Sequence, residues 1–274
     1  MTLEQHASAP AAHGDATGSP LLAVDGLCLS FGGLKAVQNF ALALPRSALF
    51  GLIGPNGAGK TTVFNLLTGV YSPDSGKMVL DSQNLVGLKP HVITATGIAR
   101  TFQNIRLFSD LSVLDNVRLA GQLRGRHSLA GTLLRTSHYQ SQEQTIRERA
   151  IELLEIFGLV ERADVSARSL SYGHQRHLEI VRALATEPKV LLLDEPAAGM
   201  NSREKQDLAK SIRGIRDRFQ LAILLIDHDM GLVMDICEQI VVLDHGVTIA
   251  RGTPTQIQND PKVIAAYLGC DTPG

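Results

Sequence analysis

The feature that most constrains this chain is a glycine-rich segment between a strand-like run and a helix-like run. Gly54-Pro55-Asn56-Gly57-Ala58-Gly59-Lys60-Thr61 follows the apolar run Leu49–Ile53 and opens the helical pattern of Thr61–Leu67, which Gly69 is placed to end. The segment matches the P-loop pattern in full, and it has the flanking strand and helix that the pattern requires. It therefore predicts a strand, a phosphate-binding loop and a helix in immediate succession.

The residue types in this loop suit the binding of a nucleotide's phosphates. Its glycines let the backbone curl so that several N–H groups converge on one anion, and the helix amino terminus adds partial positive charge. Lys60 is long enough to reach the β- and γ-phosphates, and the hydroxyl of Thr61 can ligate Mg²⁺. The sequence thus predicts a site for a nucleoside triphosphate with magnesium.

Short apolar runs elsewhere predict further strands at Val190–Leu193, Leu221–Ile226 and Ile240–Leu243, and a charged helix over Ser202–Arg218 separates the first two. Strands that alternate with helices predict an α/β fold with a largely parallel sheet. Between about residues 104 and 186 apolar residues recur with a 3.6-residue period, which predicts a helical block inserted into this core. Residues 1–20 are rich in Ala, Ser, Gly, Pro and His and predict a disordered tail.

Composition excludes several classes of protein. Of 274 residues, 44% are hydrophobic, and Lys+Arg at 26 nearly balance Asp+Glu at 27, whereas proteins that coat nucleic acid need a basic excess. The three cysteines, Cys28, Cys237 and Cys270, are far apart, which disfavours both a disulfide scaffold and a zinc site. No run approaches the roughly 18 apolar residues of a spanning helix, and the first basic residue is Lys35, so we expect a soluble protein of a cytoplasm-type compartment without a signal peptide.

Two predicted strands end in acidic residues. The run Val190–Leu193 leads into Asp194-Glu195-Pro196, and ligands of open α/β sheets bind at the carboxyl ends of strands. Asp194 can hold magnesium through its water shell, while Glu195 can orient and deprotonate a water that attacks the γ-phosphate. The run Leu221–Ile226 ends at Asp227-His228-Asp229, where His228 is a candidate contact of the γ-phosphate.

Together with further segments, these motifs resemble the ATP-binding cassette (ABC) family over about residues 21–269. Leu170-Ser171-Tyr172-Gly173-His174-Gln175 looks like the family's signature motif, and it precedes a Walker B strand. Gln103 is similar to the Q-loop glutamine, His228 to the switch histidine, and Ala198-Gly199-Met200-Asn201 to the D-loop. Phe31 stands where the family places an aromatic residue that stacks on adenine.

The resemblance implies a P-loop ATPase core with a mostly parallel sheet, an N-terminal antiparallel β part and an inserted helical subdomain within residues 21–274. It implies Glu195 and His228 as catalytic residues, Thr61, Gln103 and Asp194 at the magnesium, and Thr62 beside the P-loop at the nucleotide. It also implies that Ser171 and Gly173 face the γ-phosphate bound by a partner subunit. Two ATP molecules would then join two subunits head to tail.

The chain departs from the family pattern at four positions. Tyr172 replaces a small residue, His174 replaces a glutamine, and Asn201 replaces the D-loop aspartate. Phe31 lacks the hydroxyl of the more common tyrosine. None of these changes removes a predicted magnesium ligand or the predicted base.

Within the family the chain resembles the bacterial ATPases of branched-chain amino-acid uptake, through Phe31–Val37, Ala99–Asn104, Leu192–Asn201 and Gly252–Gly269. The resemblance implies integral membrane permeases, a second ATPase subunit (homo- or heterodimer) and an external solute-binding protein as partners, with no nucleic acid. The implied location is peripheral, on the cytoplasmic side of the inner membrane. Six arginines between Arg118 and Arg149 suggest a surface for permeases or anionic lipid headgroups.

Alternatives remain open at this level. An ABC ATPase for urea, amides or other amino acids would carry the same motifs, because nothing in the sequence touches the solute. A non-transport ABC ATPase would usually show tandem cassettes, a zinc module or coiled-coil arms. A P-loop kinase would lack the signature segment, and a nucleotide-gated binding subunit would not need Glu195 and His228.

Overall fold

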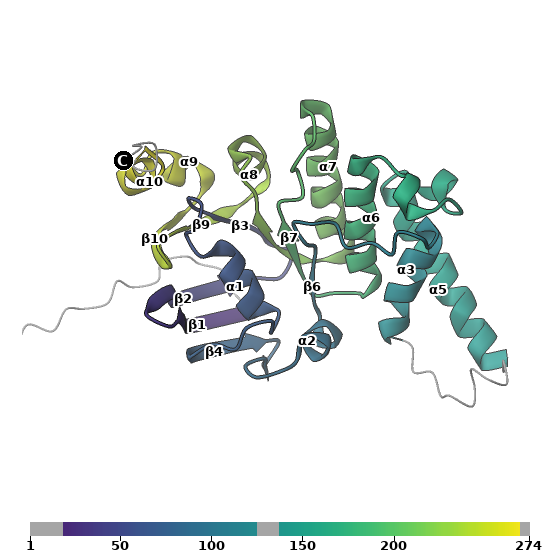
Figure 1. Ribbon diagram of the computed structural model, residues 1–274, viewed down its shortest axis with the longest axis horizontal. Coiled ribbons are helices and arrows are strands. Elements are labelled where there is room, and N and C mark those ends of the chain that lie inside the picture. The colour runs from purple at the N-terminus through teal and green to yellow at the C-terminus, as the bar shows by residue number, and fades with distance from the viewer. Residues whose placement is uncertain (1–18, 125–136, 269–274) are drawn as a thin grey trace, which may run out of the picture.

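A six-stranded sheet forms the centre of this computed structural model, which describes residues 19–124 and 137–268 (Figure 1). The strand order is β10-β9-β3-β8-β7-β6, and all neighbours are parallel except the β9–β10 pair. The strands are β3 (Leu49–Ile53), β6 (Ile98–Arg100), β7 (Val190–Asp194), β8 (Ala222–Ile226), β9 (Gln239–Asp244) and β10 (Val247–Gly252). The three strands predicted from apolar runs after residue 186 and the strand before the P-loop are therefore confirmed, within one residue at each end.

The central strands read as continuous apolar runs because both faces of the sheet are covered. Along β7, Leu191 and Leu193 face one hydrophobic core, while Val190 and Leu192 face the other. The first core contains helices α7 (Ser202–Phe219) and α8 (Met230–Ile236), and the second contains α1 (Lys60–Leu67). Burial on both faces fixes the register of the strands whose carboxyl ends carry the predicted motifs.

A second, antiparallel sheet covers α1 from the other side. Its order is β2-β1-β4-β5, from β1 (Leu22–Phe31), β2 (Leu34–Leu44), β4 (Ser75–Leu80) and β5 (Gln83–Asn84). Val63, Phe64, Leu66 and Leu67 of α1 are fully buried between the two sheets. The antiparallel β part implied by the family resemblance is thus present, and it holds the P-loop helix in place.

Helices fill the chain between β6 and β7 in the part that the structure describes. These helices are α3 (Val113–Gly121), α5 (Ser137–Ile156) and α6 (Tyr172–Ala185), with 3₁₀ turns at Gln122–Arg124, Val160–Arg162 and Ala167–Ser169. A further helix, α2 (Pro90–Thr96), lies before β6 in the chain. Figure 1 shows α3, α5 and α6 together at the end of the molecule away from the antiparallel sheet. Ala150, Leu153 and Leu154 of α5 are buried against this group, as the 3.6-residue spacing predicted. The bounds given above for a separate helical subdomain stay a prediction.

The chain ends in the short helices α9 (Pro254–Gln258) and α10 (Pro261–Leu268), which lie beside β10 and α8. Among the described residues no helix combines the length and the apolar character needed to cross a membrane. Residues 1–18 of the predicted tail, and Cys270, lie outside the described residues.

Candidate nucleotide-binding site

The sheet topology brings the predicted motifs to one edge. The P-loop follows β3, His228 follows β8, Asp194 and Glu195 close β7, and Gln103 lies three residues beyond β6. These strands are consecutive neighbours in the sheet and run parallel, so their carboxyl ends meet at the same place. Motifs separated by more than a hundred residues in the sequence therefore share one site.

A pocket of about 440 Å³ opens at this edge. Its walls include most of the predicted site residues, namely Phe31, Asn56, Gly57, Ala58, Gly59, Lys60, Thr61, Thr62, Gln103, Glu195 and His228. Gly54, Pro55 and Asp194 do not line it but lie next to residues that do. Ser171 and Gly173 are absent from its walls and belong to the helical group instead. One chain thus assembles the predicted phosphate-binding part of the site without its signature segment.

The P-loop has the backbone conformation that its glycines predict. Gly54, Gly57 and Gly59 all have positive φ, and a Cβ on Gly54 would lie 2.0 Å from the carbonyl oxygen of Leu243. Lys60 donates hydrogen bonds to the carbonyl oxygens of Gly54 at 2.6 Å and Pro55 at 2.8 Å. Its ammonium is therefore held over the loop, where it can meet an anion.

Burial and nearby carboxylates have opposite effects on the pKa of Lys60. Burial lowers the pKa of Lys60, while the nearby carboxylates of Glu195 and Asp194 act in the opposite direction. At the start of α1, Gly59 offers no side chain to cap the helix, so the first N–H groups remain available to a ligand. The loop is thus built to accept a negatively charged group.

Glu195 is held by two other predicted residues. Gln103 donates a hydrogen bond from Nε2 to one carboxylate oxygen at 3.0 Å, and Nε2 of His228 lies 2.8 Å from the other. Glu195 itself has a φ of 49°, a left-handed conformation that costs energy for a non-glycine residue. Its N–H donates to the carbonyl of Ile226 at 2.7 Å, which ties this conformation to the neighbouring strand. The carboxylate is therefore fixed towards the pocket.

Asp194 lies deeper and is paired with a residue that the sequence did not single out. Arg100, at the end of β6, donates a hydrogen bond to the Asp194 carboxylate at 2.6 Å, and both side chains are buried. The predicted metal residues supply a threonine hydroxyl (Thr61), an amide oxygen (Gln103) and a carboxylate (Asp194), which are the hard oxygen ligands that Mg²⁺ prefers. These residues fit the metal, and their roles in holding it stay predictions.

Phe31 lies at the tip of the β1–β2 hairpin and forms one wall of the pocket. Its side chain is 46% exposed, and its ring packs edge-on against Tyr71 with centroids 5.3 Å apart. This contact leaves ring surface open to the pocket, where a planar base can stack.

Several residues that line the pocket were missed from the sequence. Leu34, Lys35 and Ala36 follow Phe31 in the hairpin, and His245 and Gly246 form the turn between β9 and β10. The turn approaches so closely that a Cβ on Gly246 would lie 2.7 Å from the carbonyl oxygen of Ala36. A His-Gly pair between two strand-like runs is a turn signal, but it does not reveal what the turn touches.

The signature segment caps a helix. Ser171 is the N-cap of α6, and its Oγ also lies 3.0 Å from Nδ1 of His174. The D-loop departure, Asn201, caps α7 in the same manner by accepting hydrogen bonds from the N–H groups of Arg203 and Glu204, both at 3.0 Å. Asn and Asp are equally good at this position, which explains why the fold tolerates the change.

Two arginines of the arginine-rich stretch, Arg118 and Arg149, are engaged within the chain. Arg118 bonds to Asp115 at 2.9 Å and to Glu143 at 2.7 Å, and Arg149 pairs with Glu152. Arg126 and Arg135 lie outside the described residues. Arg118 and Arg149 therefore offer a partner less net charge than their residue type suggests.

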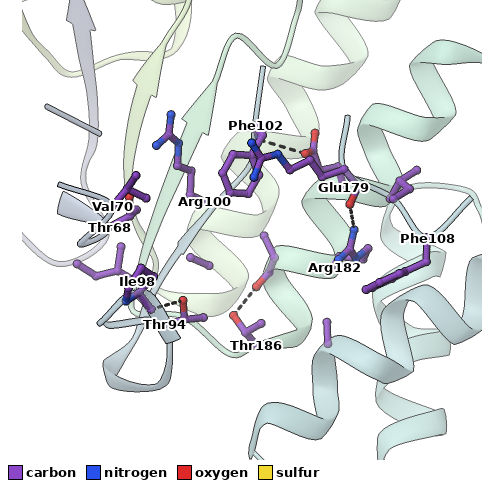
Figure 2. A pocket seen from close by; sticks show the side chains of 16 residues that line it. Thr68, Val70, Thr94, Ile98, Arg100, Phe102, Phe108, Glu179, Arg182 and Thr186 are labelled. Carbon is purple, nitrogen blue, oxygen red and sulfur yellow. Dashed lines mark hydrogen bonds between the residues drawn. The ribbon is translucent and has the colours of Figure 1, made fainter. Parts of the chain in front are cut away.

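A second cavity of about 520 Å³ lies between the core and the helical group. Figure 2 shows Arg100, Phe102, Glu179, Arg182 and Phe108 around it. Phe108 is 47% exposed, and Phe102 directly precedes Gln103 of the nucleotide pocket. We call this cavity the interdomain groove, because it lies beside the predicted helical subdomain.

Comparison with known protein families gives two matches. A model described as ABC transporter matches residues 37–198. A model described as branched-chain amino acid ATP-binding cassette transporter matches residues 247–269. The first contains the P-loop, Gln103, the signature segment and Glu195, and the second contains β10, α9 and α10.

Curated relatives match along nearly their whole length. The high-affinity branched-chain amino acid transport ATP-binding protein LivG of Escherichia coli strain K12 is 47% identical over 250 residues, covering 91% of this chain and 98% of LivG. BraF of Pseudomonas aeruginosa, described in the same words, is 45% identical with the same coverage. The lipopolysaccharide export ATP-binding protein LptB of E. coli is 35% identical, again over 91% and 98% of the two chains.

Solved structures agree with the topology. The crystal structure of the ADP conformation of an ATP-binding cassette of an ABC transporter superposes with a TM-score of 0.79 at 28% identity, covering 91% of this chain and 98% of that one. A nucleotide-free ATP-binding cassette gives a TM-score of 0.78 at 27% identity, with coverages of 90% and 98%.

Proposed function

The chain belongs to the ATP-binding cassette transporter family, and from that membership we propose that it is the ATPase subunit of a bacterial importer of branched-chain amino acids. Members of this family bind ATP and hydrolyse it. The proposed solute is supported by the likeness to LivG and BraF, which extends through the C-terminal residues 247–269. Urea, amides and other amino acids remain the competing solutes.

The observation that best supports ATP hydrolysis by this chain is the position of Glu195. Its two carboxylate oxygens are held by Gln103 and His228 at the mouth of the P-loop pocket. We propose that Glu195 accepts the proton of the water that attacks the γ-phosphate, while His228 contacts the γ-phosphate and keeps the carboxylate in place. A base of this kind contributes about 10²- to 10⁴-fold in rate.

The remaining site residues bind and orient the nucleotide. In this proposal the P-loop N–H groups and Lys60 hold the β- and γ-phosphates, and Phe31 stacks on the base. Thr61, Gln103 and Asp194 would hold Mg²⁺, which neutralises charge on the phosphates when it is bound. Arg100 keeps the Asp194 carboxylate oriented through the buried pair.

The working unit is proposed to be a dimer, homo- or heteromeric. Ser171 and Gly173 lie outside the pocket of their own chain, so a second chain is needed to bring a signature segment to the γ-phosphate. The N-terminus of α6 offers a hydroxyl, backbone N–H groups and the helix dipole to that anion. ATP would then stabilise the closed dimer, and hydrolysis would let it open.

We propose that the interdomain groove is the contact with membrane permeases and that the subunit lies on the cytoplasmic face of the membrane. It is lined by apolar side chains such as Phe108, together with Arg106 and Arg182. Phe102, in the wall, is the residue next to Gln103, so a segment seated there lies close to the group that holds Glu195. A solute-binding protein outside the membrane would deliver the amino acid to these permeases.

Uptake measurements test the solute and the reaction separately. Deletion of the gene in its own bacterium should abolish high-affinity uptake of radiolabelled leucine, and a plasmid copy should restore it, whereas a Glu195→Gln copy should not. Loss of urea or amide uptake with normal leucine uptake would contradict the proposed solute. The purified chain should release free phosphate from Mg-ATP; a phosphorylated product in place of free phosphate would indicate a kinase instead.

A further inference from the structure

Tyr172, in the signature segment, differs from the small residue that the family pattern has there, and the proposed mechanism gives it no role. Its side chain is 47% exposed, yet its ring contacts the D-loop and its hydroxyl contacts Arg176 of the same helix. The ring lies against the backbone of Gly199, where an added Cβ would approach Tyr172 Cε1 to 3.1 Å. Gly199 has a φ of 74°, so the D-loop turns at the point where the tyrosine ring packs on it. A small residue at position 172 would leave this contact unmade.

The hydroxyl of Tyr172 receives two hydrogen bonds from Arg176, one turn further along α6. Nε of Arg176 donates to Tyr172 Oη at 3.2 Å, and Nη2 donates at 2.9 Å. The Arg176 side chain is only 2% exposed, so each of its N–H groups needs a partner within the protein. Tyr172 supplies an oxygen that glycine or alanine cannot supply.

The other N–H groups of Arg176 bind the segment that carries Gln103. Nη1 donates to the carbonyl oxygen of Phe102 at 2.7 Å and to Glu179 at 3.3 Å, and Nη2 donates to the carbonyl oxygen of Gln103. With the two bonds to Tyr172, all five donors of the guanidinium have acceptors. Glu179 completes the connection by accepting the N–H of Phe102 at 3.1 Å, one of the contacts drawn in Figure 2.

These contacts join two parts of the site that act on different nucleotides. Gln103 faces Glu195 in the pocket of its own chain. Ser171, which precedes Tyr172, points to the nucleotide of a partner chain in the proposed dimer. Arg176 therefore links the backbone at Gln103 to the first turn of α6, and the tyrosine ring links that turn to Gly199.

We propose that Tyr172 is a positioning residue that, together with Arg176, latches the signature turn to the Gln103 segment and so couples the two ATP sites of the dimer. This inference rests on the proposed dimeric ATPase. The latch also has contacts at the interdomain groove, because Arg176 bonds to Phe102 and Glu179, and both of these residues line that groove. Movement of a permease segment in the groove would therefore reach both nucleotide sites together.

The variant Tyr172→Phe tests the latch because it keeps the ring on Gly199 and removes only the hydroxyl that accepts from Arg176. It leaves two donors of a buried guanidinium without this acceptor, so thermal melting of the variant is measured alongside to show that it folds. In the complete transporter reconstituted in liposomes, we expect the Hill coefficient of ATP hydrolysis to fall towards 1. We expect the amount of solute transported per ATP hydrolysed to fall about fivefold. A fivefold change is about the lower end of the effects that coupling between two sites typically has. ATP affinity of the purified chain should change less than about twofold, since Tyr172 does not line the pocket.

A second variant separates coupling from packing. In an Arg176→Lys background, Tyr172→Phe should have no further effect on the Hill coefficient, because the two residues act through the same bonds. Arg216→Lys, at a surface ion pair with Asp217 and Glu238, serves as the matched control and should leave the Hill coefficient unchanged. Thermal melting shows whether Arg176→Lys folds. If it does not, the Hill coefficient of the Tyr172→Phe transporter alone tests the latch.

Two outcomes would overturn the latch. One is a Tyr172→Phe transporter with the Hill coefficient and the uptake per ATP of the wild type. The other is a wild-type Hill coefficient of 1, since there would be no coupling to transmit. Failure of the proposed function looks different, because the wild-type chain would then bind or hydrolyse no Mg-ATP.

Discussion

Arg100 and Asp194 form an ion pair at 2.6 Å in which both side chains are almost inaccessible to water, at 6% and 3% exposure. Arg100 also donates to the Asn65 side chain of α1 at 2.7 Å, so one guanidinium connects the P-loop helix with the strand that carries the acidic residues. The pair fixes the position of a carboxylate that we expect to serve the metal. It also means that Asp194 cannot be changed without consequences for the fold.

Replacement of Arg100 by methionine should destabilise the protein. The change leaves the Asp194 carboxylate buried without its partner, and breaking such a pair costs about 3–5 kcal/mol. The free energy of unfolding in urea measures this loss. The double variant Arg100→Met/Asp194→Asn should recover part of it, because no unpaired charge remains; a double variant as unstable as the single one would contradict the explanation.

Glu195→Gln should abolish turnover while nucleotide binding persists. The amide cannot accept a proton from water, so hydrolysis should drop by about 10²- to 10⁴-fold. Phosphate release measures the rate, and size-exclusion chromatography with Mg-ATP should show a trapped dimer. Near-normal hydrolysis in this variant would remove Glu195 from the role of general base.

Phe31→Ala should weaken ATP binding without affecting the phosphate contacts. The stacking of a base on an aromatic ring contributes about 1–3 kcal/mol. Titration with a fluorescent ATP analogue measures the affinity. Phe108→Ala is a matched control, because Phe108 is as exposed as Phe31 but lies in the interdomain groove. Equal effects of the two substitutions on affinity would argue against a stacking role for Phe31.

The ion pair of Asp229 with Lys205 should make stability depend on pH. The hydrogen bond from Lys205, at 2.5 Å, is the main cause that lowers the pKa of Asp229 in the folded protein. A carboxyl group with a lowered folded pKa stabilises the protein above its unfolded pKa of 3.8, and this contribution is lost as pH falls through the folded value.

Asp229→Asn should therefore reduce the free energy of unfolding at pH 7 by less than about 1 kcal/mol, the size of a partly exposed ion pair. The asparagine retains the capping oxygen for the N–H of Leu232, so the difference reports the charge. Chemical denaturation at several pH values should show the difference vanishing in acid. Lys205→Met should show the same pH dependence, and a difference that persists in acid would assign the effect to capping instead.

Local sequence was enough to predict the central strands and the P-loop helix. The strand Leu49–Ile53 and helix α1 agree with prediction because their apolar runs, glycines and flanking residues all specify the same local structure. The helical character of residues 104–186 was equally readable from periodicity, as the buried face of α5 shows. The family resemblance added the antiparallel sheet, which the apolar pattern alone did not specify.

Contacts between distant segments were not predictable in this way. Arg100 and Arg176 are ordinary basic residues in the sequence, yet each is buried and bonded to a motif 70 or more positions away. The turn at His245 and Gly246 likewise reaches the P-loop pocket only through the pairing of β9 with β3. Such pairs leave no local pattern, because their spacing is set by the sheet and not by the chain.

The amino-acid order alone determined which chemical groups this protein carries and on which strand ends they stand, since phosphate loops, acidic strand ends and helix caps depend on neighbouring residues. The tertiary structure decided how these groups are held: Glu195 between Gln103 and His228, Asp194 against Arg100, and Tyr172 between Arg176 and Gly199. Hydrogen bonds and ion pairs act over about 3 Å, so they form only after folding has brought remote segments that close together.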